Sequence, residues 1–131
     1  MAALRITTTA AQLFVADIKT SCDFYTRTLG FSVVFVHGEP PFYAQVKRDA
    51  GRINLKHMDR PVIDPALRDR ETLLSVDLGV NSRADLEELS REFRAKGASF
   101  FQTLQKQPWG AMNFIVKDPD GNLLLFASPD K

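Results

Sequence analysis

The same order of predicted elements occurs twice in the sequence, and this repetition limits the possible folds more than any other feature. Each half begins with a strand of alternating apolar and polar residues, continues with a short amphipathic helix and ends with three further strands. The predicted strands are residues 11–16, 31–36, 42–46 and 53–57 in the first half, and 74–80, 99–104, 112–116 and 123–127 in the second. We therefore predict an α+β fold of two tandem βαβββ repeats.

The two repeats are expected to form one domain, residues 1–131, with repeat one at about 8–60, a linker at about 61–70 and repeat two at about 71–129. The linker is rich in proline and mixed charge and has no counterpart in the other repeat. Because one βαβββ unit leaves a sheet face uncovered, pairing of the two units would bury it. An unrelated α+β sandwich remains an alternative fold, because alternating strands and two helices do not determine a topology.

Local signals place the ends of the two helices. Thr20-Ser21-Cys22-Asp23 and Ser82-Arg83-Ala84-Asp85 each have a hydroxyl residue followed three positions later by an acid, the pattern of a helix N-terminus. Gly30 and Gly97 follow the helices where a left-handed cap is expected. The last two strands are separated by Asp118-Pro119-Asp120-Gly121-Asn122, which predicts a tight turn.

Charge and cysteine content exclude several classes of protein. Lysine and arginine number 17 against 16 acidic residues, so the clustered basic excess of a nucleic-acid-binding domain is not expected. The same balance argues against strong attraction of a cationic ligand. The single cysteine, Cys22, permits no intrachain disulfide and suggests a reducing compartment. Residues 1–9 lack the apolar stretch of a signal peptide, and no apolar run is long enough for a membrane span. A cytoplasmic protein without a nucleic-acid or membrane partner is expected.

Several short motifs resemble one known family. The opening repeat carries Val15-Ala16-Asp17, Phe24-Tyr25 and Leu29-Gly30-Phe31, and the closing repeat carries Pro108-Trp109-Gly110, Phe114 and the turn at 118–122. In this register the motifs resemble the vicinal oxygen chelate superfamily of glyoxalases, bleomycin-resistance proteins and dioxygenases, and its bleomycin-resistance branch in particular. The resemblance implies a curved mixed sheet with a cavity on its concave face.

The resemblance also locates the positions at which enzymes of this superfamily hold a divalent metal with histidine, glutamine or glutamate. In this chain those positions are Ala10, Asn54, Leu74 (or, in another register, Thr72 or Glu71) and Leu125. Alanine and leucine cannot coordinate a metal, and a catalytic zinc needs about three converging protein ligands. We therefore expect no metal and no other cofactor. Whether His37 or His57, which lie outside these positions, binds a metal stays open.

Strand alternation predicts which side chains line the cavity. In the first strand Leu13 and Val15 are expected to face the helices, which leaves the opposite parity for the cavity. The predicted ligand-binding residues are Gln12, Phe14, Asn54, Lys56, Met58, Trp109, Met112 and Leu125. Two alternatives remain. Lys56 and Arg52 are each consistent with a solvated charge at a strand edge as well as with anion binding, and Trp109 is also consistent with a cap on the edge of the core. No catalytic residue is predicted.

These expectations favour a non-catalytic protein that binds a small molecule, such as an antibiotic or a planar aromatic metabolite. It would act by sequestration in a groove at a homodimer interface, since related dimers close each cavity with repeats from two chains. Bleomycin-binding members are typically acidic, to match a cationic drug, whereas this chain is nearly neutral. The alternative is a lyase, isomerase or dioxygenase-like enzyme of the same fold with unusual or no metal ligands.

Overall fold

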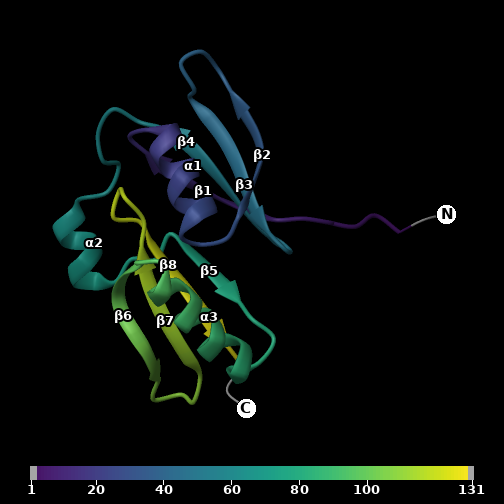
Figure 1. The fold of residues 1–131 in the computed structure, drawn as a ribbon, viewed down its shortest axis with the longest axis vertical. Helices are drawn as coiled ribbons and strands as arrows, with labels where there is room; N and C mark the ends of the chain where they lie inside the picture. Colours follow the sequence, from purple (N-terminus) through teal and green to yellow (C-terminus); the bar gives the residue numbers. More distant parts are fainter. Residues whose placement is uncertain (1–2, 130–131) are drawn as a thin grey trace.

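The computed structural model describes residues 3–129 and contains two βαβββ repeats in succession (Figure 1). Repeat one comprises β1 (Ala10–Val15), α1 (Ile18–Arg27), β2 (Ser32–His37), β3 (Tyr43–Arg48) and β4 (Gly51–His57). Repeat two comprises β5 (Val76–Gly79), α3 (Arg83–Ala95), β6 (Ser99–Lys106), β7 (Met112–Lys117) and β8 (Leu123–Ser128). The predicted α+β fold and its repeats are confirmed.

Each repeat forms its own four-stranded mixed sheet. Sheet one has the order β1-β4-β3-β2, and sheet two has the matching order β5-β8-β7-β6. In both sheets the first and last strands of the repeat pair in parallel, whereas the other neighbours are antiparallel. The first strand of each repeat therefore lies at the edge of its sheet, beside the last strand of that repeat.

The two helices of the repeats begin differently from one another. Ser82 caps α3 as predicted, since its hydroxyl accepts a hydrogen bond from the Asp85 amide at 3.1 Å. For α1 the predicted start at Thr20 was wrong, because Asp17 is the cap and accepts from the Thr20 amide at 2.9 Å. The earlier start lets Ile18 contribute to the core. Side-chain burial therefore decided between two possible caps.

The segment between the repeats contains a helix that the sequence did not indicate. This helix, α2 (Pro65–Glu71), has Asp64 as its N-cap and begins with a proline, a combination typical of helix starts. Its Arg68 side chain is buried and donates from Nη2 to the Asp120 carbonyl oxygen at 3.3 Å. Gly121 makes room for this contact, because a Cβ there would collide with the guanidinium. The helix is thus tied to the second repeat.

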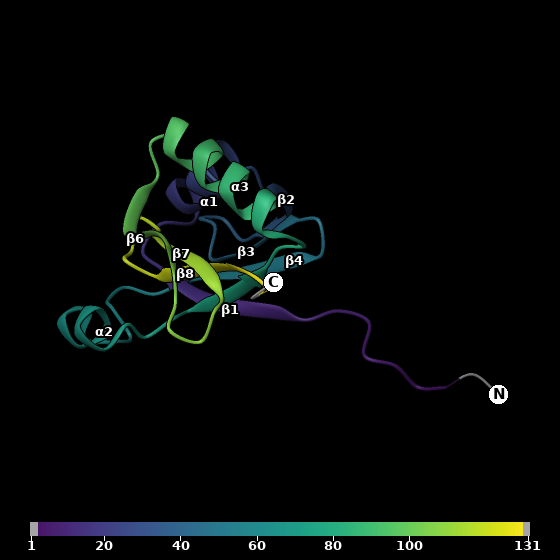
Figure 2. The ribbon, with the colours of Figure 1, turned by 90° about the horizontal axis from the view of Figure 1, so that it is seen from below.

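The helices and strands form layers around one continuous core. Figure 2 shows α1 and α3 side by side over one face of the strands, with α2 on the opposite side. Buried residues of both sheets face α1 and α3, including Leu13, Ile53 and Leu55 from repeat one and Phe114 and Phe126 from repeat two. The other face of sheet one, called here the open face, is left without a helical cover from α1 and α3. No helix among residues 3–129 has the length and apolar character needed to cross a bilayer.

Candidate functional site

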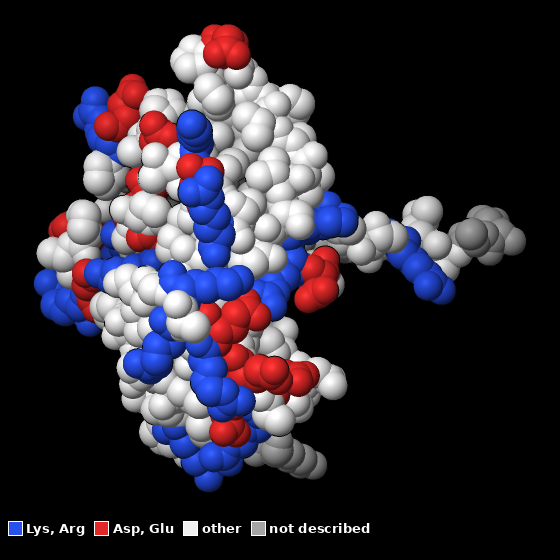
Figure 3. Space-filling model, in the orientation of Figure 1, with Lys and Arg blue, Asp and Glu red and all other residues white. Residues whose placement is uncertain are grey.

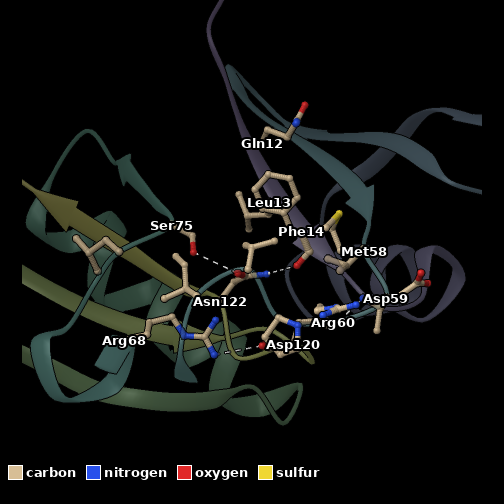
Figure 4. Close-up of a pocket in the computed structure, with 16 residues that line it drawn as sticks. Gln12, Leu13, Phe14, Met58, Asp59, Arg60, Arg68, Ser75, Asp120 and Asn122 are labelled. Atoms are coloured by element: carbon tan, nitrogen blue, oxygen red, sulfur yellow. Dashed lines mark hydrogen bonds between the residues drawn. The ribbon is translucent and has the colours of Figure 1, made fainter. Parts of the chain in front are cut away.

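A cavity of about 320 Å³ lies where the two repeats meet (Figure 4). Repeat one contributes Gln12 and Phe14 from β1 and Met58, the residue that follows β4. Repeat two contributes Ser75 and Asn122, and the chain between the repeats closes another side. Three of the predicted ligand-binding residues therefore line one cavity, although they come from two separate segments of the chain.

Hydrogen bonds between the repeats hold this cavity in shape. The Asn122 side-chain amide donates to the Phe14 carbonyl oxygen at 3.2 Å, and the Ser75 hydroxyl donates to Asn122 Oδ1 at 3.3 Å. The Asp120 carboxylate accepts from the Ala16 amide at 2.8 Å. Because these bonds fix the backbone on both sides, the lining positions of β1 are held in place relative to the second repeat.

Polar side chains on the open face of sheet one form a network beside the cavity. Gln12, Asn54 and Gln45 lie in one row across β1, β4 and β3. The Gln45 amide donates to Asn54 Oδ1 at 2.8 Å, and Arg52 Nη1 donates to Gln45 Oε1 at 2.9 Å. Tyr43 makes a longer bond of 3.4 Å to Gln12 Oε1. Gln12 belongs to both the network and the cavity, so the two regions are adjacent.

Aromatic rings stand on the same face next to this network. The Phe35 ring stacks on His37 with a centroid distance of 4.7 Å and lies 5.7 Å from the Tyr43 ring. Sequence reasoning did not assign Phe35, Tyr43 or Gln45 to the site. A bulge between Val33 and Phe35 interrupts the alternation of side chains along β2. The sequence pattern of β2 therefore does not show that Phe35 points to the open face. The alternation of side chains along β3 could have indicated that Tyr43 and Gln45 point to the open face.

The remaining predicted residues do not line the cavity. Asn54 and Lys56 are on the open face of sheet one, with Lys56 directly beside Phe14. Leu125 is on sheet two, paired with Asp77 and Ile115. Met112 is only 8% exposed. It lies in the core because its side chain points to the same face of β7 as those of Phe114 and Val116.

Trp109 lies in the turn between β6 and β7, at the end of the molecule opposite the β2–β3 turn (Figure 1). Its side chain is 68% exposed, so it does not fill the edge of the core. Within one chain, the structure does not bring Trp109 to Gln12, Phe14 and Met58.

The positions that correspond to metal ligands in the resembling enzymes do not fit a metal here. The side chains of Ala10, Leu74 and Leu125 offer no donor atom, and the side-chain oxygen Oδ1 of Asn54 already accepts a hydrogen bond from the Gln45 amide. His57 places Nδ1 2.9 Å from the Ala16 carbonyl oxygen and Nε2 2.9 Å from Asp59 Oδ1, which engages both ring nitrogens. Within residues 3–129, no three His, Cys, Asp or Glu side chains are grouped as a metal site would require.

A buried acid lies behind the cavity in the turn that bears Asn122. The Asp118 carboxylate accepts from the Asn122 side-chain amide at 2.8 Å and from the Tyr25 hydroxyl at 2.9 Å. Burial raises the pKa of Asp118 above its usual value, and these hydrogen bonds oppose the shift. Burial also raises the pKa of Tyr25 well above its usual value, which keeps the hydroxyl protonated as a donor. The Asp118 carboxylate and the Tyr25 hydroxyl point into the protein interior, and together they hold Asn122 in position.

Comparison with known proteins shows which family has this architecture. The family model described as the Glyoxalase/Bleomycin resistance protein/Dioxygenase superfamily matches residues 5–126. Among solved structures, the bleomycin resistance determinant encoded on transposon Tn5 is 21% identical, with 94% of this chain and 98% of that chain covered and a TM-score of 0.71. The bleomycin-binding protein of Streptomyces verticillus, complexed with copper(II)-bleomycin, is 20% identical, with 95% and 97% covered and a TM-score of 0.69.

A glyoxalase/bleomycin resistance protein/dioxygenase from Alicyclobacillus acidocaldarius is 16% identical, with 93% of this chain and 90% of that chain covered and a TM-score of 0.75. At these identities the structural likeness shows the fold alone. No curated protein matches the chain in sequence. Because the family model covers almost the entire chain, this protein belongs to the glyoxalase/bleomycin resistance protein/dioxygenase superfamily.

Proposed function

We propose that this protein binds a small planar molecule, an antibiotic or an aromatic metabolite, and sequesters it without chemical change. The observation that carries the proposal is the cavity of about 320 Å³ lined by Gln12, Phe14 and Met58, next to the polar and aromatic open face of sheet one. Apolar walls with a few fixed polar groups are the usual composition of small-molecule sites. Sequestration requires affinity and a preorganised site, and the hydrogen-bonded amide network supplies such order.

The residue types at the site support binding rather than metal-dependent catalysis. Three of the four metal-ligand positions of the superfamily's enzymes carry alanine or leucine in this chain, and the fourth is an asparagine whose oxygen is engaged. The alternative, a lyase, isomerase or dioxygenase-like enzyme, would need another means of polarising its substrate. Conversion of a bound compound by the purified protein would favour that alternative.

We further propose that the protein is a homodimer in which sheet two of a second copy closes the site. Val33, Val34, Val36 and Phe42 of the β2–β3 hairpin are 42–53% exposed. Val33 and Val36 lie opposite the core residues Val46 and Ala44, so this patch is on the helix side of β2, at the edge of sheet one beside the open face. Figure 3 shows a largely uncharged surface over this hairpin, at the upper right of the view, with an acidic group at the top. Apolar patches of this kind commonly mark protein interfaces. A second copy would also bring its Trp109 and Leu125 toward a site that a single chain leaves open.

The binding proposal can be tested with a thermal-shift screen of planar aromatic compounds and peptidic antibiotics, followed by calorimetry on each compound that stabilises the protein. Phe14→Ala should weaken binding about tenfold or more, because the side chain lines the cavity. Phe24→Ala is the matched control, since Phe24 lies on α1 and should leave the affinity of the folded protein unchanged. Failure of every compound to bind saturably would contradict the proposal.

Light scattering at micromolar concentration tests the dimer, and the expected mass is twice that of the chain. Val36→Lys should shift the protein toward the monomer by placing a charge in the exposed apolar patch. Ala84→Lys, which adds the same charge at an exposed position of α3 outside both sheets, should leave the mass unchanged. A monomer mass for the unaltered protein would contradict the dimer.

A further inference from the structure

The nearly neutral total charge of the chain hides a strong separation of charge between its elements. The eight strands contain a single acidic residue, Asp77, although the chain has 16 acids in all. The four strands of sheet one contain no acid and carry four cationic residues: Lys47, Arg48, Arg52 and Lys56. Apart from Asp77, the acids among residues 3–129 lie outside the strands. The sheet that bears the proposed site is therefore basic.

Three of these four cations lie on the open face. Arg48 instead turns toward the helices, where its Nη1 donates to Glu92 Oε2 at 2.7 Å. Lys47 has the opposite parity on β3 and lies directly across from Arg52 on β4, while Lys56 lies across from Tyr43. Within residues 3–129, none of these three open-face cations forms an ion pair. The open face thus carries uncompensated positive charge.

The pairing of Lys47 with Arg52 is unfavourable for the sheet itself. Like charges directly opposite each other on neighbouring strands destabilise a sheet, so folding alone does not explain this arrangement. Arg52 is also held in place, because one of its N–H groups donates to Gln45 Oε1 at 2.9 Å. The rest of the guanidinium makes no other hydrogen bond within residues 3–129. A bound anion would relieve the repulsion and use these donors.

The aromatic rings lie at a suitable distance from this cationic pair. Phe35 is directly opposite Gln45, which is two residues before Lys47 on β3 and therefore roughly 7 Å from it along the strand. Phe35 and Tyr43 approach to 5.7 Å and give an aromatic surface on the same face. A ring lying on this surface would place a short acidic substituent next to Lys47 and Arg52.

We propose that the open face of sheet one selects planar aromatic carboxylates, with the ring against Phe35 and Tyr43 and the carboxylate held by Lys47 and Arg52. This inference rests on the proposed binding function and adds the charge of the ligand to it. It also predicts that the ligand preference of this protein differs from that of a relative that would bind a cationic drug, because a cation on this face would meet only like charge.

The experiment compares three probes that share one ring and differ in charge: 2-naphthoate, 2-naphthamide and 2-naphthylmethylammonium. Calorimetry should show that the carboxylate binds at least about tenfold more tightly than the amide, with the ammonium weakest, and that added salt weakens only the carboxylate. Arg52→Gln and Lys47→Gln should each remove most of this advantage while leaving the amide's affinity unchanged. Arg91→Gln, an exposed charge on α3, is the matched control and should have no effect.

A second measurement needs no ligand. Lys47→Gln should raise the melting temperature of the free protein slightly, because it removes the repulsion from Arg52, whereas Arg91→Gln should not. Equal or tighter binding of the amide or the ammonium would overturn the inference and leave the proposed binding function standing. Binding of none of the three probes would overturn it as well. Only the additional failure of the broader screen would contradict the proposed function.

Discussion

The Tyr25 hydroxyl, on α1 of repeat one, donates to Asp118 Oδ2 at 2.9 Å in the β7–β8 turn of repeat two, and this bond is buried. The same turn reaches repeat one through Asp120, which accepts from the Ala16 amide at 2.8 Å, and through Asn122, which donates to the Phe14 carbonyl oxygen at 3.2 Å. The Asp-Pro-Asp-Gly-Asn segment is thus both a turn and the joint between the repeats, and it positions β1 at the cavity.

Tyr25→Phe should lower the free energy of unfolding by about 1–3 kcal/mol, because a buried carboxylate loses a donor. Losing that hydrogen bond should also raise the pKa of Asp118 further. Urea denaturation measures the first effect. Tyr43→Phe is the control, since it removes only an exposed 3.4 Å bond to Gln12 and should change stability little. Equal stability of the two variants would show that the buried bond does not hold the repeats together.

The Arg48–Glu92 pair predicts a specific dependence of stability on pH. The hydrogen bond from Arg48 lowers the pKa of Glu92 below its usual value of 4.5. A carboxyl group whose pKa is lowered by folding stabilises the fold above its unfolded pKa, and this contribution disappears as the pH falls below 4.5 through the folded value. Glu92→Gln should therefore reduce stability at neutral pH and lose less stability on acidification.

The expected size at neutral pH is about 0.5–1 kcal/mol, since both side chains are partly exposed and solvent screens the pair. Denaturation of the variant and the unaltered protein on both sides of this pH window gives the difference between them. Asp118, whose pKa is raised, acts in the opposite sense but is common to both proteins. Glu88→Gln, on the same helix, is the control. A parallel pH dependence for Glu92→Gln and the unaltered protein would contradict the assignment.

Elemental analysis of the purified protein should find no stoichiometric divalent metal. The reason is chemical, because Ala10, Leu74 and Leu125 provide no donor atoms. About one zinc, nickel, manganese or iron per chain, lost in His37→Ala or His57→Ala, would show that a histidine binds metal and would favour the enzyme alternative.

Trp109→Ala should leave the melting temperature nearly unchanged, because a side chain that is 68% exposed leaves no cavity in the core. If Trp109 of a second copy stacks on the ligand, binding should quench its fluorescence, and the substitution should weaken binding by roughly 1–3 kcal/mol. Trp109→Phe keeps an aromatic ring and should retain most of the affinity. Unchanged affinity for Trp109→Ala would remove this residue from the site.

The local pattern of apolar and polar residues in the sequence was sufficient to identify the strands and the repeat. Alternation along β1 correctly placed Leu13 and Val15 in the core, where each is 1% exposed, and Gln12 and Phe14 on the other face, because side chains alternate in any extended strand. The Ser82 cap was equally readable, since its hydrogen bond spans only three residues. The start of α1 was misread because two caps compete locally, and only burial of Ile18 decides between them.

Contacts between distant residues were decided by the tertiary structure. Tyr25 and Asp118 are 93 positions apart, so no periodicity links them, and the turn motif alone does not reveal that it joins the repeats. The bulge in β2 changes which residues face the site, and its position depends on pairing with β3. A count of charges gives a nearly neutral chain. That the cations of sheet one gather on one face, where Lys47 meets Arg52, follows from strand register, which the long-range packing of the repeats establishes.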